Sequence, residues 1–344
     1  MNFVTVLIAV LIFGLIILIH EFGHYTVARC MGVTVYEFSI GMGPALWKTE
    51  KNGTTYALRL LPIGGYVSME GENDLAQEGE SDDPNAFSRK PVLQRVAILS
   101  AGVCNNLLLG YALLILLTAL NGWVGTTQII RLEEGTSAYG TLQVGDTITA
   151  VNGHRVRTSN DITYEFLRDE DGLVDLTVRR NGETQTHSIR FPLEVYENQQ
   201  YITIDFKVAA VRPTALQYIT YPVNWGISIV KEIWGTLLGL LTGRYAVNQL
   251  SGPVGVVTAI QKASRIGFRS LLNLAAYLTI NIGVFNLLPV PILDGGRIVL
   301  ELACEVLPKK RFVKKVVGAL MSISVLLLLL LMAVVTFQDI TRII

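Results

Sequence analysis

The segment Ile19-His20-Glu21-Phe22-Gly23-His24 ends an almost unbroken apolar run that begins at Phe3. Two histidines four residues apart lie on one face of a helix, one turn apart. Neutral imidazoles in this arrangement are typical zinc ligands, and a catalytic zinc takes three protein ligands and keeps one position open. Glu21 stands next to the first histidine, where the general base of such a site is expected. The segment therefore predicts a metal site at the end of a hydrophobic helix, with a third ligand from elsewhere in the chain.

A motif this short also arises by chance, so its surroundings have to decide its meaning. The chain has four histidines, and two of them lie in this motif. The other two, His154 and His187, fall in a polar region and are expected at the surface. Ionisable side chains at the end of a membrane span are costly and mark functional sites. We therefore interpret His20 and His24 as metal ligands.

The composition indicates several membrane spans and one soluble domain. Of the 344 residues, 51% are hydrophobic and 16% are charged, and the formal net charge is +0. Such a chain is too apolar for an ordinary soluble enzyme. Its charge gives no reason to expect a nucleic acid as partner. The three cysteines lack the spacing of a metal or redox motif and predict no disulfide framework.

The apolar runs predict four transmembrane helices, at about residues 2–24, 96–120, 271–288 and 316–335. The first run lacks the basic start and the cleavage site of a signal peptide, so it is expected to remain in the protein. Residues 213–242 are also apolar. Pro222, Asn224 and the Lys231-Glu232 pair favour an amphipathic segment at the membrane surface over a fifth span.

Two regions between the spans have strand-like patterns. In residues 33–69, the run 54–60 and the turn signal Lys51-Asn52-Gly53 predict a membrane-associated β-hairpin or small sheet, with an ordinary loop as the alternative. In residues 123–208, strand-like runs alternate with turns. The sequence Gly145-Asp146-x-Ile148-x-x-Val151-Asn152-Gly153 resembles the signature of PDZ domains, which bind an extended peptide or C-terminus by strand addition. This region is predicted to be one PDZ-like α+β domain.

The third metal ligand is sought where the third span ends, in Asn286-Leu-Leu-Pro289-Val-Pro291-Ile-Leu293-Asp294-Gly295-Gly296. Its prolines and glycines break the helix, and a broken backbone at membrane depth is tolerated only where it is buried in protein or lines a cavity. We interpret Asp294 as the third ligand, with a plain loop aspartate as the alternative. Asn105 and Asn106 interrupt the second span. They predict either hydrogen bonds between helices or a side chain that faces the site.

The topology follows from the requirement that the metal ligands meet on one side of the membrane. If residues 213–242 crossed, Asp294 would lie on the face opposite His20 and His24. The short loop between the third and fourth spans is rich in basic residues, and the positive-inside rule places it in the cytoplasm: Lys309, Lys310, Arg311, Lys314 and Lys315. Four spans satisfy both conditions. They put the metal site near the cytoplasmic face, and the PDZ-like domain and both termini outside.

Nearly the whole chain resembles the bacterial site-2 proteases, intramembrane zinc metalloproteases of the RseP type. The resemblance is carried, in order along the chain, by His20-Glu21-x-x-His24, Pro62-Ile-Gly64-Gly65-Tyr66-Val67, Ser251-Gly252-Pro253-Val254-Gly255 and the segment from Asn286 to Gly295. It implies that His20, His24 and Asp294 hold one Zn²⁺ per chain and that Glu21 is the catalytic acid and base.

The resemblance also implies a site for the substrate. The β-structure from Tyr36 to Val67, which includes Gly64 and Gly65, would receive the substrate as an added strand. Asn106 takes the position of the family's asparagine in the second span, although Val103 replaces the proline that the family has after Gly102. Asn106 or Asn286 is expected to hold the substrate backbone or to stabilise the oxyanion.

The predicted protein is a polytopic α-helical membrane protein with four regions. Residues 1–122 hold two spans, the histidine motif and the β region, and residues 123–208 form the PDZ-like domain. Residues 209–270 are an amphipathic interfacial segment, and residues 271–344 hold the last two spans with Asp294.

The predicted function is cleavage of the membrane segment of a single-span protein in a bacterial plasma membrane. The resemblance implies that the substrate is already trimmed outside, for example an anti-sigma factor or a signal-peptide remnant, and that the PDZ-like domain filters it. One alternative is a membrane-anchored PDZ adaptor with an inactive site. A metal transporter is disfavoured, because the ligands form one catalytic-type cluster and not a path of polar residues.

Overall fold

The computed structural model describes residues 3–72, 81–196, 199–243, 250–306 and 311–343. Among these residues, four helices are long and apolar enough to cross a membrane. They are α1 (Phe3–Cys30), α2 (Val92–Asn121), α6 (Phe268–Asn286) and α8 (Arg311–Ile343). Each coincides with a predicted span, although α1 continues past His24. The predicted amphipathic segment contains α4 (Gln217–Leu241), which is not one of the four. The basic residues Lys309 and Lys310 lie outside the described residues.

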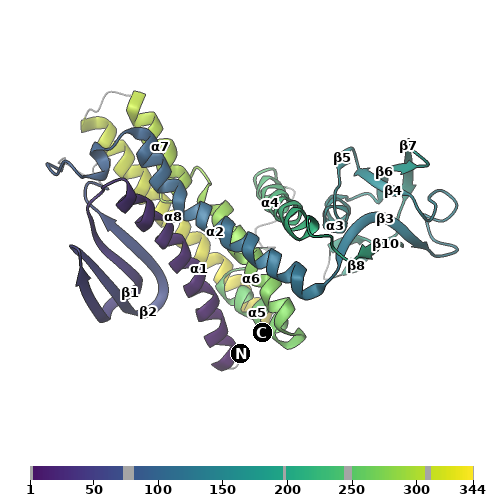
Figure 1. The fold of residues 1–344 in the computed structure, drawn as a ribbon, viewed down its shortest axis with the longest axis horizontal. Helices are drawn as coiled ribbons and strands as arrows, with labels where there is room; N and C mark the ends of the chain where they lie inside the picture. The colour runs from purple at the N-terminus through teal and green to yellow at the C-terminus, as the bar shows by residue number, and fades with distance from the viewer. Residues whose placement is uncertain (1–2, 73–80, 197–198, 244–249, 307–310, 344) are drawn as a thin grey trace. The chain divides into compact units, whose positions relative to one another are not determined.

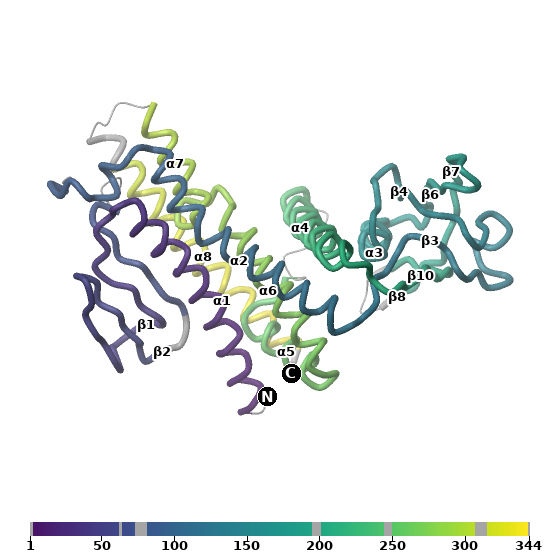
Figure 2. The backbone as a smooth tube through the Cα atoms, in the orientation of Figure 1, coloured from purple at the N-terminus to yellow at the C-terminus, as the bar shows by residue number. Residues whose placement is uncertain are grey.

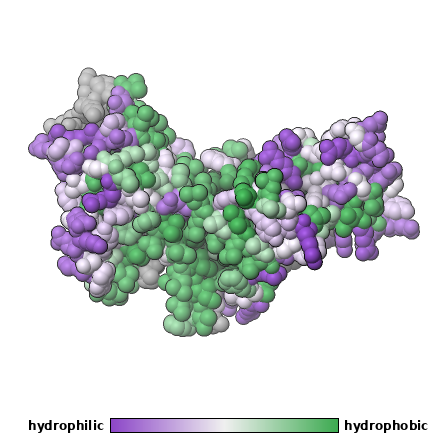
Figure 3. Space-filling model, viewed as in Figure 1, coloured by the Kyte–Doolittle hydropathy of each residue, from purple (hydrophilic) through white to green (hydrophobic). Residues whose placement is uncertain are grey.

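The chain folds into two compact units, one made of Met1–Leu113 with Thr236–Ile344 and the other of Leu114–Gly235. The first unit holds α1, α6 and α8 with two shorter helices, α5 (Pro253–Ile266) and α7 (Asp294–Val306). Figure 3 shows a broad apolar surface over the helices of this unit. Such a surface is expected where lipid replaces water as the solvent.

A small sheet follows α1 and lies beside it (Figure 1). Its strands are β1 (Val35–Lys51) and β2 (Thr54–Met69), and the predicted turn at Asn52 and Gly53 has positive φ angles of 54° and 75°. Residues 37–40 pair with 65–68 on one side and with 55–58 on the other, and residues 45–51 pair with 54–59. Segment 65–69 is therefore an edge of this sheet, since no other described strand pairs with it.

Some apolar side chains of the sheet are buried against the helices, and others are exposed. The buried set forms a cluster that joins α1, the sheet and α2, and includes Ala28, Phe38, Val67 and Leu99. On the sheet, large apolar side chains remain 51–64% exposed: Met42, Leu46, Trp47, Leu60 and Leu61. Figure 2 shows the backbone of the two strands alongside α1. Exposed apolar side chains in this number are typical of a surface that meets a membrane or a partner.

The predicted helix break after the third span is confirmed. α6 ends at Asn286, residues 287–293 are not helical, and α7 begins at Asp294. The two glycines that follow Asp294 let the start of α7 pack backbone against backbone on this loop. A Cβ atom at Gly295 would overlap the carbonyl group of Leu287, and one at Gly296 would overlap that of Val290.

The second unit is built on a six-stranded sheet with the order β10-β3-β4-β6-β7 and β5 paired to β4. Its strands are β3 (Val124–Leu132), β4 (Thr147–Val151), β5 (His154–Arg155), β6 (Leu173–Arg180), β7 (Glu183–Arg190) and β10 (Phe206–Val211). A separate pair is formed by β8 (Leu193–Tyr196) and β9 (Gln199–Ile202). The helix α3 (Ser159–Arg168) lies between β5 and β6 in the chain and packs on the sheet through Ile162 and Phe166. The sheet extends to Val211, past the predicted boundary at residue 208.

The aspartate of the PDZ-like signature is a structural anchor in this unit. Asp146 is buried and accepts hydrogen bonds from Nε and Nη2 of Arg180 at 2.8 and 2.7 Å, and from the backbone N–H of Gln143 at 2.9 Å. Arg180 also donates to the carbonyl oxygen of Thr141 at 3.0 Å. The guanidinium group lowers the pKa of the Asp146 carboxyl below its ordinary value. The loop before β4 is thereby fixed to β6.

Part of α4 packs on α3 within the same unit. Ser228 Oγ donates to Asp161 Oδ1 at 2.6 Å, and the hydroxyl of Tyr164 donates to the carbonyl oxygen of Lys231 at 2.8 Å. Ser228 is buried. Asn224, one of the polar residues that favoured an amphipathic segment, also faces this unit, because its Oδ1 atom accepts a hydrogen bond from Nη1 of Arg157 at 3.4 Å.

Candidate metal centre

His20 and His24 lie one turn apart near the C-terminal end of α1, and both are buried. Their Nε2 atoms are 3.2 Å apart. The Nδ1 atom of His24 is 2.8 Å from the carbonyl oxygen of Ile98. Since a carbonyl oxygen only accepts, Nδ1 of His24 carries the hydrogen and donates it, which leaves the Nε2 lone pair directed toward His20.

Asp294, the first residue of α7, completes the cluster. Its Oδ2 atom is 3.1 Å from Nε2 of His20 and 3.4 Å from Nε2 of His24. Three ligands at about 2.0–2.1 Å from a tetrahedral zinc are separated from one another by about 3.3 Å. The three observed separations fit that geometry, so these side chains can hold one metal ion.

Asn106 lies behind His20 and not in front of it. Its side chain is 0% exposed, and its Nδ2 atom is 3.3 Å from Nδ1 of His20. With Nε2 turned to the cluster, Nδ1 of His20 carries a hydrogen and needs an acceptor. The Oδ1 atom of Asn106 has no hydrogen-bond partner among the described residues, and exchanging the amide oxygen and nitrogen would supply that acceptor. The neighbouring Asn105 donates instead to the carbonyl oxygen of Ile19 at 3.0 Å and ties α2 to α1.

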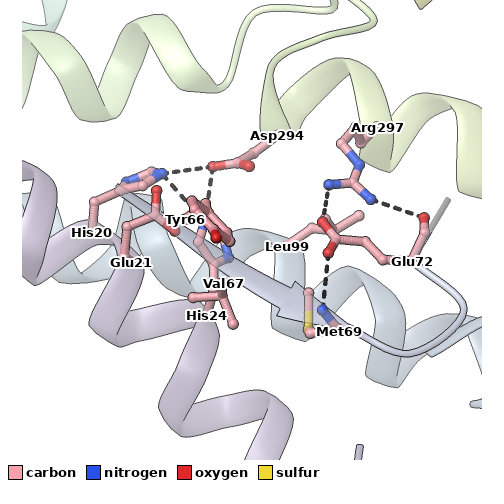
Figure 4. Close-up of a pocket in the computed structure, with 10 residues that line it drawn as sticks. All are labelled: His20, Glu21, His24, Tyr66, Val67, Met69, Glu72, Leu99, Asp294 and Arg297. Atoms are coloured by element: carbon pink, nitrogen blue, oxygen red, sulfur yellow. Dashed lines mark hydrogen bonds and ion pairs between the residues drawn. The ribbon is translucent and has the colours of Figure 1, made fainter. Parts of the chain in front are cut away.

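Glu21 lines two cavities that meet at the cluster, and His20 and Asp294 line both as well. The larger cavity, of 290 Å³, has mostly apolar walls with one amide: Ile17, Gly64, Gly65, Ile282, Asn286, Ile292 and Leu293. The smaller cavity, of 180 Å³, ends in a charged pair and is drawn in Figure 4: its other walls are His24, Tyr66, Val67, Met69, Glu72, Leu99 and Arg297. A chain that crossed the cluster would have room on either side of Glu21.

The sheet edge runs directly past Glu21. A Cβ atom at Gly65 would lie 3.2 Å from Cγ of Glu21 and 2.9 Å from the carbonyl oxygen of Ser39. Gly64 has a positive φ of 81°, which favours glycine at that position. The structure thus brings Gly64, Gly65 and Asn286 to the cavity walls, whereas Asn106 does not line either cavity.

Two residues of the smaller cavity were not found from the sequence. Arg297 donates from Nη1 to Oε1 of Glu72 at 2.5 Å and from Nη2 to its carbonyl oxygen at 3.1 Å. Arg297 could have been suspected, because it follows Asp294 by one helical turn. Glu72 lies in an acidic stretch with no motif and gave no signal.

Comparisons with known proteins agree with this chemistry. The model of Peptidase family M50 matches residues 8–331. A Clostridium acetobutylicum protein assigned by name to the zinc metalloproteases is 34% identical over 99% of this chain and 98% of its own length. The regulator of sigma-W protease RasP of Bacillus subtilis is 28% identical over 98% of both chains.

The solved structures add little. The PDZ domain of an SdrC-like protein from Listeria innocua matches 24% of this chain and 92% of that domain, at 17% identity and a TM-score of 0.22, which is too low to support an argument.

The protein is a zinc-dependent metalloprotease, and four of its described helices are long and apolar enough to cross a membrane. The chain belongs to Peptidase family M50, the site-2 proteases, whose members are integral membrane proteins.

Proposed function

We propose that His20, His24 and Asp294 hold the zinc ion and that Glu21 is the acid and base of peptide hydrolysis. The observation that carries this assignment is the convergence of the three ligand atoms directly beside Glu21. A bound zinc activates water and polarises a carbonyl group. The Glu21 carboxylate is placed to accept a proton from the attacking water and to pass it to the leaving amine nitrogen.

The substrate is the membrane segment of a single-span protein, cleaved in an extended form. A helical substrate has its backbone hydrogen bonds already made, so it must unwind before it can be cut. The unpaired edge at residues 65–69 offers the freed groups new partners by strand addition. Asn286, on the wall of the larger cavity, is placed to bind the substrate backbone or the oxyanion. Asn106 has a different role from the one expected from sequence, because it is buried against His20 and is suited to orient that ligand.

The PDZ-like unit acts on substrate selection, either by excluding bulky ectodomains or by binding a newly formed C-terminus. The four-region organisation expected from the sequence places this unit outside the cell, together with both termini, and the zinc near the cytoplasmic face. The name of the Bacillus relative, regulator of sigma-W protease, supports a regulatory substrate such as an anti-sigma factor. Deletion of residues 126–208 should let the enzyme cut substrate that has not been trimmed. Undiminished discrimination would contradict the filter.

The decisive experiment is cleavage of a model single-span substrate by the purified protein. Wild type is expected to cut it, a zinc chelator to stop cleavage, and Glu21→Gln to abolish cleavage while zinc content stays at one per chain. The alternative of a membrane-anchored PDZ adaptor predicts that wild type and Glu21→Gln behave alike in every assay. That result, with zinc bound to both, would contradict the catalytic assignment.

A further inference from the structure

Polar side chains follow one face of α7, and each of them contacts a different element. Arg297 follows Asp294 by one helical turn, and Glu301 follows Arg297 by one more, so the three lie on one side of the helix. Asp294 faces the histidines of α1. Arg297 faces the turn after β2, and Glu301 pairs with Arg95 of α2. This face of α7 therefore contacts α1, the turn after β2 and α2.

The contact between Arg297 and Glu72 has a fixed geometry. Nη1 of Arg297 binds the carboxylate at 2.5 Å and Nη2 binds the main-chain carbonyl oxygen of the same residue at 3.1 Å, as Figure 4 shows. The second carboxylate oxygen of Glu72 accepts from the backbone N–H of Met69, the last residue of β2, at 3.3 Å. The side chains are only 20% and 17% exposed. A two-point contact of a guanidinium with little solvent around it constrains both partners more than a surface ion pair does.

This contact adds to the packing that places α7. Residues 287–293 are not helical, so α7 is not a continuation of α6. Its first residues pack on the backbone of that loop, and side-chain contacts with other elements constrain the rest of the helix. The last residues of β2 form the wall of the smaller cavity, opposite Asp294. Arg297 also compensates the charge of Glu72, which would otherwise lie unpaired in the same cavity as Glu21 and Asp294.

We propose that Arg297 and Glu72 are a positioning pair that holds Asp294 at a fixed distance from the substrate-pairing edge at residues 65–69. This inference rests on the proposed function, in which Asp294 is a zinc ligand and that edge receives the substrate. The pair acts through the residues that it holds and does not itself bind the zinc.

The test compares the full-length wild type with Arg297→Met, Glu72→Ala and the double variant. Zinc affinity is measured by competition with a chelator, and KM and kcat are measured separately on the model substrate. Each single variant is expected to bind zinc about 10- to 100-fold more weakly, as when other supporting contacts of metal ligands are lost. The double variant should be no worse than the weaker single variant, because each residue acts through the other.

Glu305→Gln is the matched control on the same helix. Glu305 shares Arg95 with Glu301, and its side chain is half exposed, so Arg95 keeps a buried partner when Glu305 is neutralised. This variant is expected to retain wild-type zinc affinity. Arg297→Lys keeps the charge but loses the two-point contact. It should unfold at the same temperature as wild type in the metal-free state and still bind zinc more weakly.

The positioning pair would be overturned if Arg297→Lys and Glu72→Ala bound zinc as tightly as wild type, or if the two losses of affinity added up in the double variant. Either result would leave the proposed function standing. A wild-type chain that binds no zinc would instead contradict the proposed function, and the pair with it.

Discussion

The backbone of Gly102 in α2 lies directly against the imidazole ring of His24 in α1, so closely that a Cβ atom at residue 102 would overlap Nε2 of that ring. The ring cannot easily move away. Its Nδ1 atom is held by the carbonyl oxygen of Ile98, and its Nε2 atom lies within 3.4 Å of Asp294. The absence of a side chain at residue 102 is therefore a condition for the ligand cluster to form.

We predict that Gly102→Ala loses zinc. Overpacking of this kind typically costs about 1–3 kcal/mol, which corresponds to about a 5- to 150-fold loss of affinity if it falls on the ligand geometry. Zinc content after dialysis against a chelator measures it. Gly14→Ala in α1 is the control, since a Cβ atom there would have no neighbour within 4 Å. Equal zinc retention in the two variants would mean that α2 can shift without disturbing His24.

Asn106→Leu is predicted to weaken zinc binding by about 10- to 100-fold, because it removes the partner of Nδ1 of His20 while keeping a side chain of similar size. The measurement is the zinc dissociation constant by chelator competition. A variant with unaltered zinc affinity and a raised KM would restore the role in substrate binding that the sequence first suggested for this residue.

Asn286→Ala, in contrast to Asn106→Leu, is predicted to lower catalysis without loss of zinc. Its side chain lines the larger cavity and is not one of the candidate ligands, so zinc content should stay at the wild-type level. Removing one polar contact to the substrate or the oxyanion should lower kcat/KM by about 10- to 1,000-fold. Steady-state cleavage of the model substrate tests this, and loss of zinc from the variant would count against it.

Trp47, which is 58% exposed on the sheet that follows α1, is predicted to contact lipid. The fluorescence of Trp47 is obtained by subtracting the emission of Trp47→Phe from that of wild type. In vesicles that contain brominated lipids, this fluorescence should be quenched. A membrane surface accounts for exposed apolar side chains that would be unfavourable in water. If the fluorescence of Trp47 were quenched by a water-soluble quencher and not by brominated lipids, the sheet would lie away from the bilayer.

The second unit, residues 114–235, is predicted to lose stability in acid through Asp146. The pKa of this carboxyl is lowered in the folded state by Arg180, from an ordinary value of about 3.9. A lowered folded-state pKa gives stability that is fully present above about pH 4 and is lost as the pH falls through the folded-state value. Hydrogen exchange of residues 124–211 against pH measures this loss.

The control for that prediction is Asp146→Asn, which should be less stable than wild type by about 1.5–3 kcal/mol at neutral pH because Arg180 loses its charged hydrogen-bond partner. The difference between the two proteins should shrink as the pH drops below about 4. A difference that did not change with pH would show that the carboxylate charge is unimportant.

Several features of this protein could be predicted from its sequence, because each depends on local chemistry. A spacing of four residues puts both histidines on one helix face whatever the rest of the chain does. Long apolar runs predict long apolar helices, Asn52-Gly53 predicts a tight turn, and the prolines and glycines after the third run predict the end of a helix. The structure has the apolar helices, the turn and the helix end where they were expected.

Only the tertiary structure decided which side chains meet. Asp294 reaches His20 across most of the length of the chain, and a helix break gives no direction to the helix that follows it. Asn106 lies on a helix that is apolar on every side, so no pattern in its sequence tells which face is turned to the site. Glu72 and Arg297 come together because a turn after β2 happens to pack on α7. Contacts of this kind depend on packing between distant elements, and local sequence does not encode them.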